Sequence, residues 1–139
     1  MFKKSFILIL MMTFVSTSAL AGTAKKADKL AKALENYQKT GKTRLCVSLT
    51  RIDTSRVIDD YTILFLMKGD KAYVNRLPNR CSRLGYEKSF SYSLSTNQLC
   101  NVDLITVFDS SSNIPGPTCG LGKFEEYVKK PKADEQAGK

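Results

Sequence analysis

The chain has 139 residues, of which 22 are lysine or arginine, 13 are aspartate or glutamate and none is histidine. Without histidine it has no Ser-His-Asp or Cys-His nucleophile pair, no imidazole general base and no histidine-ligated zinc or copper. The formal net charge of +9 favours contact with anionic surfaces such as phosphate-bearing lipid headgroups, although a basic surface can also serve solubility alone.

The first residues are typical of a signal peptide. Two lysines precede an apolar run, residues 6–15, and small residues then end in the A-x-A-like triplet 19–21. The run is roughly half of the about 20 residues that a membrane-spanning helix needs. We therefore predict a signal peptide over residues 1–21, a periplasmic location and no transmembrane segment after cleavage. The remaining chain has the length of one domain.

The predicted mature chain begins with a basic segment, residues 22–42. Residues 23–38 within it are expected to form a helix, because apolar side chains recur at helical spacing: Ala27, Leu30, Ala31, Leu34 and Tyr37. Lysines occupy the opposite face, and a basic amphipathic helix can lie on an anionic membrane surface. We favour packing against the domain, since the apolar stripe is narrow, rich in alanine and lacks tryptophan and phenylalanine.

Residues 43–128 change to a hydrophobic period of two, which indicates β-strands. The apolar run 61–67 is the candidate central strand, and Gly69-Asp70 then turns the chain into a hairpin. Further strands are expected at residues 45–49, 72–75, 90–94, 102–108 and 122–128, with loops at 79–85 and 110–118 and a disordered tail at 129–139. The predicted fold class is mostly β (α+β): a small antiparallel sheet or partly closed barrel preceded by one N-terminal helix.

Four cysteines in an exported domain predict two disulfides. Sequence alone leaves three connectivities open. We favour Cys81 with Cys100 and Cys46 with Cys119, the second of which would tie the first strand of the β domain to the last. A zinc site made by all four cysteines is the alternative, but the chain contains no C-x-x-C pair. We therefore predict no metal and no cofactor.

Three carboxylates lie beside predicted core strands: Asp59, Asp60 and Asp103. Two acids can act as an acid/base pair if their surroundings separate their pKa values. On a strand, however, the adjacent Asp59 and Asp60 point to opposite faces. Aspartate in a turn also bonds to its own backbone, and a turn is the interpretation that we favour here.

Arg76, Arg80 and Arg83 surround Cys81 in the segment NRLPNRCSRL. Three guanidinium groups around one loop can bind a carboxylate or phosphate through forked hydrogen bonds. They would also lower the pKa of Cys81 if it were a free thiol, which would make it reactive. A structural disulfide is the expected state in an oxidising compartment. The anion site is therefore kept as a candidate, and the nucleophile is not favoured.

Residues 46–124 resemble a family of small exported proteobacterial proteins that is classified as a domain of unknown function. The matching segments are CVSLTRI, RVIDDYTILF, AYVNRLPNRC, QLCNVDLITV and CGLGKF. The resemblance implies a Gram-negative envelope protein in the periplasm and no particular activity. It also implies that five charged residues belong to the family pattern, namely Asp59, Asp60, Arg76, Arg80 and Asp103.

These observations predict a non-catalytic periplasmic domain that binds or stabilises a component of the envelope. One alternative is a hydrolase-like enzyme that uses Asp59, Asp60 or Asp103. Another is a cationic binder of anionic lipid or lipid A phosphates that uses the first helix and the three arginines. Because the chain is expected to be exported, we predict no nucleic-acid partner.

Protein recovered from the envelope is expected to begin at Gly22, because the A-x-A pattern that signal peptidase reads ends at Ala21. N-terminal sequencing or an intact mass measures this directly. Intact Met1 on a membrane-embedded species would contradict both the cleavage and the absence of an anchor.

Overall fold

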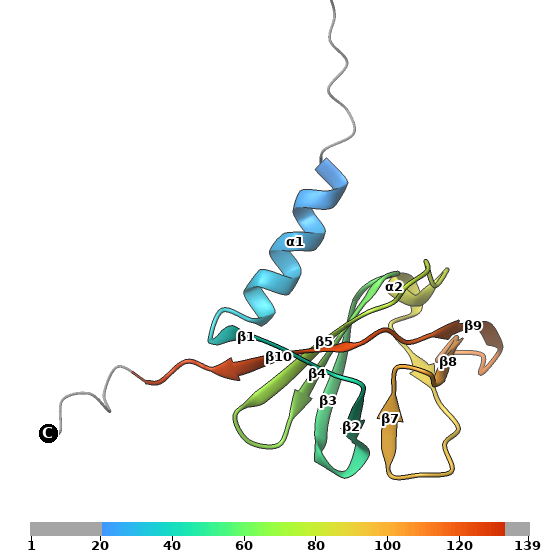
Figure 1. Cartoon of the computed structure of the whole chain (residues 1–139). Helices are drawn as coiled ribbons and strands as arrows, with labels where there is room; N and C mark the ends of the chain where they lie inside the picture. Colours follow the sequence, from blue (N-terminus) through green and yellow to red (C-terminus); the bar gives the residue numbers. More distant parts are fainter. Residues whose placement is uncertain (1–20, 133–139) are drawn as a thin grey trace, which may run out of the picture.

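The computed structural model describes residues 21–132, which Figure 1 shows in outline. Residues 1–20 of the predicted signal peptide and residues 133–139 of the predicted tail lie outside the described residues. One helix, α1 (Ala21–Ala33), precedes the strands, and a short helix, α2 (Leu84–Glu87), interrupts them. Neither helix of this part of the chain is long and apolar enough to cross a membrane.

The strands of residues 37–129 form three sheets, and all of their pairings are antiparallel. The order in the five-stranded sheet is β1 (Tyr37–Arg44), β10 (Phe124–Lys129), β5 (Lys71–Arg76), β4 (Thr62–Met67) and β3 (Ile52–Asp59). The smaller sheets are β2 (Cys46–Ser48) with β7 (Gln98–Cys100), and β8 (Leu104–Phe108) between β6 (Phe90–Ser91) and β9 (Pro115–Gly120). A 3-10 turn, η1 (Leu49–Arg51), connects β2 to β3. The predicted fold class is thus confirmed as mostly β and antiparallel with one N-terminal helix, and the described sheets form no closed barrel.

β4 is buried on both faces, as its apolar sequence TILFLM requires. Phe65 points into the larger core, which lies between the five-stranded sheet and the two smaller sheets. The neighbouring Leu64 points to the opposite face, into a smaller core that it shares with Leu34 at the end of α1. The prediction of a buried strand within residues 61–67, joined to the next strand by a hairpin, is therefore confirmed, but the central strand of the five-stranded sheet is β5 and not β4.

Aromatic rings connect the main sheet to the smaller sheets within the larger core. Phe65 of β4 lies edge-on to Phe124 of β10, with ring centroids 5.7 Å apart, and to Phe90 of β6, at 6.4 Å. Tyr73 of β5 meets Phe124 at 6.5 Å. Edge-to-face contacts of this kind add about 0.5–1.5 kcal/mol each to the free energy of burial. Packing therefore holds the β6–β8–β9 sheet to the main sheet, in addition to the Cys81–Cys119 disulfide, which joins the segment after β5 to β9.

The N-terminal helix is shorter than predicted, because α1 ends at Ala33 instead of near residue 38. Residues 37–44 of the basic segment form β1, the edge strand that pairs with β10. Tyr37 has the spacing of the helical stripe but reaches the smaller core from β1. Pairing with β10 satisfies backbone N–H and C=O groups of both strands, and this tertiary gain overrides the local helical pattern.

The segment 110–118, predicted to be a loop, contains the start of β9. Two prolines, Pro115 and Pro117, argue against a strand because they lack a backbone N–H. β9 can accommodate them because it is an edge strand that pairs only with β8, so that half of its backbone needs no partner in the sheet. The prediction is therefore wrong for residues 115–118.

The prediction of two disulfides is confirmed, but the favoured pairing is wrong. Cys46 is bonded to Cys100 and Cys81 to Cys119. Cys46 and Cys100 are directly opposite in the β2–β7 ladder, with Cα atoms 4.0 Å apart, so the strand register decides this pairing. The register is a long-range property that cysteine spacing does not contain.

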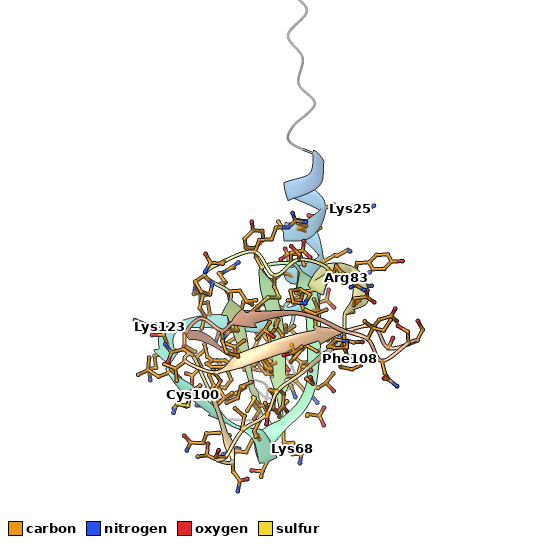
Figure 2. All side chains as sticks on the ribbon, turned by 90° about the vertical axis from the view of Figure 1, so that its right-hand side faces the viewer. Lys25, Lys68, Arg83, Cys100, Phe108 and Lys123 are labelled. Carbon is orange, nitrogen blue, oxygen red and sulfur yellow. A yellow bond between two sulfur atoms is a disulfide. The ribbon has the colours of Figure 1, made fainter. Side chains whose placement is uncertain are left out.

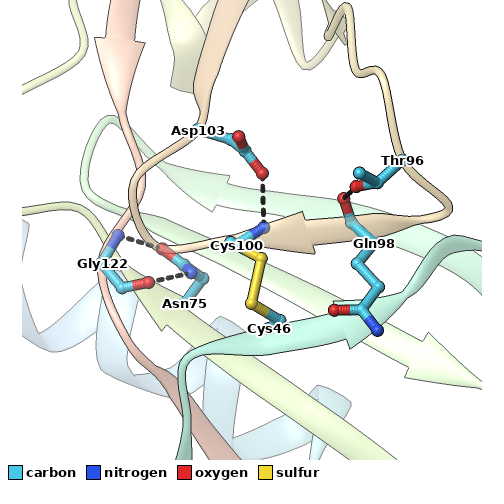
Figure 3. Close-up of a disulfide and its surroundings, with 7 residues drawn as sticks. All are labelled: Cys46, Asn75, Thr96, Gln98, Cys100, Asp103 and Gly122. Carbon is cyan, nitrogen blue, oxygen red and sulfur yellow. Dashed lines mark hydrogen bonds between the residues drawn. A yellow bond between two sulfur atoms is a disulfide. The ribbon is translucent and has the colours of Figure 1, made fainter.

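Asn75 joins β5 to the start of β10 through both ends of its amide. This fully buried side chain donates to the carbonyl oxygen of Gly122 at 2.7 Å and accepts from the Gly122 N–H at 2.9 Å (Figure 3). The approach requires a glycine, because a Cβ atom on Gly122 would lie 1.9 Å from the backbone oxygen of Arg76. Gly122 is therefore a packing requirement of the fold.

Substitution Gly122→Ala should lower the free energy of unfolding by at least about 1–3 kcal/mol, the usual cost of forcing an extra carbon into a packed site. Gly120→Ala is the matched control, because a Cβ there would meet only a Leu104 methyl at 4.0 Å. Urea unfolding of both variants measures the difference. Equal stability of the two variants would contradict this account of Gly122.

Candidate anion-binding site

The three arginines of the predicted anion site do not converge. Each guanidinium faces a different carboxylate: Arg76 faces Glu125 at 3.6 Å, Arg80 faces Asp60 at 2.8 Å and Arg83 faces Glu87 in α2. A guanidinium that already faces a carboxylate has less charge to offer to a ligand. The structure therefore does not bring the three side chains together around a common anion position.

Asp60 has the most contacts of the three predicted carboxylates. Its Oδ1 accepts from the Gly85 N–H at 2.8 Å, and its Oδ2 accepts from Arg80. Partial burial raises the pKa of Asp60, but the hydrogen bonds from Gly85 and Arg80 outweigh burial, so the pKa lies below its ordinary value. A carboxyl group held ionised in this way is unsuited to act as a general acid near neutral pH.

Asp59 and Asp103 make the turn contacts expected of aspartate. Oδ1 of Asp59 accepts from the Tyr61 N–H at 2.7 Å, and Oδ2 of Asp103 accepts from the Cys100 N–H at 2.6 Å (Figure 3). Within residues 21–132, no group of three or more acidic or cysteine side chains could hold a metal ion. The predicted acidic residues thus serve separate local contacts.

A cavity of about 570 Å³, here called the basic cavity, opens beside the Cys46–Cys100 disulfide at the turn of the β4–β5 hairpin. Its cationic lining comes from three parts of the chain: Arg44 at the end of β1, Arg51 in η1, and Lys68 and Lys71 on the two sides of the hairpin turn. Figure 2 shows Lys68 and Cys100 toward the end of the molecule opposite to Lys25. Sequence reasoning did not select any of these four cations.

Backbone contacts bring the cationic segments together. The hairpin turn uses Gly69 at φ +101°, a conformation that side-chain-bearing residues rarely adopt. Directly before it, the Lys68 N–H donates to the Arg51 carbonyl at 2.8 Å, and Lys68 Nζ donates to the Thr50 carbonyl at 3.0 Å. These two hydrogen bonds hold η1 against the hairpin, which places the side chain of Arg51 at the same cavity as that of Lys68.

A buried carboxylate, Glu126 of β10, lies behind the basic cavity and contacts two of its cations. Oε2 of Glu126 is 3.0 Å from Lys71 Nζ and 3.5 Å from Arg44 Nε, and it also accepts from the Tyr73 hydroxyl at 3.2 Å. Lys71 lowers the pKa of Glu126, burial raises it, and hydrogen bonds from Tyr73 and Thr40 lower it further, so the pKa is below its ordinary value. Glu126 is therefore ionised at neutral pH and neutralises part of the charge around the cavity.

The remaining charge of the lining is positive. Asp70 is the carboxylate of the lining itself, and it is 84% exposed and lies 3.8 Å from Lys129 at the end of β10. Glu126 contacts Arg44 and Lys71 but has no ion pair with Arg51 or Lys68. Cations therefore outnumber carboxylates around the basic cavity, and the excess lies on the side of Arg51 and Lys68.

Apolar and neutral polar groups complete the lining. Met67 and Tyr73 border the cavity from the main sheet, and Ser48 and Gln98 border it from the ends of β2 and β7. The mixture allows a ligand with an anionic group and a neutral body, since charged, hydrogen-bonding and apolar contacts are all available.

No family model, curated protein or solved structure matches this chain. The resemblance of residues 46–124 to an exported proteobacterial family therefore stays a prediction, and a function has to be inferred from the residues of the chain itself.

Substitution Glu126→Gln should lower the free energy of unfolding by about 1.5–3 kcal/mol at pH 7, the range for hydrogen bonds to charged groups. Because the pKa of Glu126 is lower in the folded chain, its contribution is fully present above the unfolded value of about 4.3 and is lost as pH falls through the folded value. Urea unfolding at pH 7, 4 and 2.5 should show the difference from the natural protein narrowing with acid. Glu35→Gln, at an exposed carboxylate, is the control. A difference that stays constant down to pH 2.5 would contradict the assignment.

Proposed function

We propose that this chain is an exported, non-catalytic periplasmic domain that binds an anionic component of the envelope in the basic cavity. The observation that carries the proposal is the convergence of Arg44, Arg51, Lys68 and Lys71 on one cavity. Its volume of about 570 Å³ is within the range of small-molecule sites, about 300–1,000 Å³. Guanidinium and ammonium groups together favour a phosphate or carboxylate group.

The cysteines support the exported location. All four are joined in disulfides, a state typical of oxidising compartments such as the periplasm and rare in the cytosol. The signal-peptide pattern and the resemblance to exported proteobacterial proteins agree with this location.

The chemistry of the remaining groups supports a binding role over catalysis. The chain has no histidine, and its cysteines are not available as thiolates. Asp60 is held ionised by Arg80 and Gly85, while Asp59 and Asp103 bond to nearby backbone N–H groups. The pKa of Asp60 lies below its ordinary value, whereas the acid of a hydrolase-like acid/base pair requires a raised carboxyl pKa.

The mixed lining favours a phosphorylated sugar over a bare anion. A phosphate meets the excess cations near Arg51 and Lys68, and sugar hydroxyls meet the hydroxyl of Ser48 and the amide of Gln98. The apolar face of a sugar ring can lie on Tyr73 or Met67. The phosphorylated glucosamine headgroup of lipid A has this chemistry, and so has a soluble sugar phosphate.

The variant Arg51→Gln/Lys68→Gln should weaken binding of glucosamine 6-phosphate by at least about tenfold, since each lost charged hydrogen bond is worth about 1.5–3 kcal/mol. This variant leaves the ion pairs of Glu126 intact. Lys29→Gln/Lys32→Gln on α1 is the control, because it removes the same charge away from the cavity. Isothermal titration calorimetry at two salt concentrations measures the affinities, and binding should weaken with salt.

A second arm uses co-sedimentation with vesicles that contain lipid A, which distinguishes a membrane headgroup from a soluble sugar phosphate. Unchanged affinity in the cavity variant for both probes would contradict the proposed site. An equal loss in the cavity variant and in the control would show general charge attraction and would also reject it.

A further inference from the structure

α1 is attached to the main sheet at only one of its ends. Leu34, directly after the helix, is buried in the smaller core, and Leu30 and Ala33 are half-buried against the same core. Earlier in the helix, Ala27 and Ala31 are exposed. Figures 1 and 2 agree with this, since in both views the N-terminal end of α1 projects beyond the sheet. The helix and the sheet therefore diverge from their contact at Leu34.

The space between them is a cavity of about 660 Å³, here called the helix cleft. On the helix side its wall consists of Ala27, Leu30 and Ala31. On the sheet side, Ile58 and Tyr127 form its floor. The small alanine side chains do not reach the sheet, so this apolar floor stays uncovered where a larger residue would fill the space.

Cations outnumber carboxylates in the lining of the helix cleft. Arg76 and Lys26 line it, together with a single carboxylate, Asp59. Arg76 Nε is 3.6 Å from Glu125, and Glu125 is closer to Lys39, at 3.0 Å. The charge of Arg76 is therefore only partly neutralised. Oδ1 of Asp59 already accepts a hydrogen bond from the Tyr61 N–H.

From this apolar floor and excess of cations we infer that the helix cleft binds a single-chain anionic amphiphile, with its acyl chain between α1 and the sheet and its carboxylate at Arg76 and Lys26. The volume of the cleft lies within the range of about 300–1,000 Å³ for small-molecule sites. An aliphatic chain covers the apolar floor that α1 leaves open, and a carboxylate matches the forked donors of Arg76. The site is on the face of the sheet opposite to the basic cavity and does not depend on the function proposed for that cavity.

The test uses the exported form of the protein with 11-(dansylamino)undecanoic acid, an acyl-chain carboxylate whose fluorescence increases in an apolar site. We expect saturable binding of one molecule per chain, displaced by laurate. Ala31→Trp fills the cleft and should weaken binding at least tenfold. Lys32→Trp is the matched control, because it adds the same side chain at an exposed position outside the cleft and should bind within twofold of the natural protein.

A second pair of variants tests the contribution of the cationic side chain Arg76 separately from that of the space in the cleft. Arg76→Gln should weaken laurate at least fivefold while changing binding of uncharged dodecanol less than twofold. Arg56→Gln is the control, because this exposed arginine of β3 does not line the cleft and should leave both ligands unchanged. Circular dichroism and urea unfolding confirm that each variant is folded. The variant Arg51→Gln/Lys68→Gln should bind laurate normally, which separates this site from the basic cavity.

Three results would overturn the inference. The first is the absence of saturable binding by the natural protein, and the second is equal binding by Ala31→Trp and Lys32→Trp. The third is a stable dimer in solution that Ala31→Trp dissociates, because the cleft would then be covered by a second copy of the chain.

Discussion

The need to cover both faces of β4 is the constraint on which the other elements of the fold depend. Its sequence TILFLM has no polar face, so a single sheet open to water on one side cannot accommodate it. The neighbouring strands β3 and β5 satisfy the backbone hydrogen bonds of β4, but its side chains need packing partners on both faces of the sheet. The end of α1 supplies one layer through Leu34, and the two smaller sheets supply the other. Burial of a large apolar side chain contributes about 1.5–3 kcal/mol, so these layers are worth much of the stability of a small domain.

Both candidate sites lie where this cover is incomplete. A two-stranded sheet is at best marginally stable alone, and the Cys46–Cys100 disulfide holds β2 and β7 of this sheet to each other. The three-stranded sheet is attached to the main sheet by the Phe65–Phe90 contact and by the Cys81–Cys119 disulfide, which joins the segment after β5 to β9. The β2–β7 ladder does not extend over the turn of the β4–β5 hairpin, so the basic cavity opens there with Met67 and Tyr73 at its border. On the other face α1 leaves the helix cleft, because its contact is confined to its last turn. The helix and the smaller sheets each cover only part of one face, and the main sheet is therefore left with a concave surface on each of its two faces.

Local patterns in the sequence predicted the strands whose own residues decide their state. The run 61–67 and the last expected strand, residues 122–128, agree with β4 and β10, and the chain turns at Gly69-Asp70 between β4 and β5 as expected. The prediction missed β3, whose sequence IDTSRVID has few apolar residues although it pairs with the neighbouring β4. Elements that depend on a distant partner were not predicted either. β1 forms because the backbone groups on one side of β10 are available for pairing. β9 accommodates its prolines because it is an edge strand. Cys46 pairs with Cys100 because the two residues are opposite each other in the β2–β7 ladder. Periodicity and spacing describe neighbours along the chain, so such long-range contacts are outside what they can predict.

The same limit explains why the candidate arginines and the observed cations differ. Arg76, Arg80 and Arg83 are close in sequence, but each faces a carboxylate that spacing alone did not reveal. Arg44, Arg51, Lys68 and Lys71 are scattered in sequence, and only the closure of η1 against the hairpin turn brings them to one cavity. The four converging cations repel one another, and Glu126 offsets part of this repulsion through its ion pairs with Arg44 and Lys71. Its contacts do not include Arg51 or Lys68, so the carboxylate that stabilises the cluster leaves the excess positive charge of the cavity on these two residues.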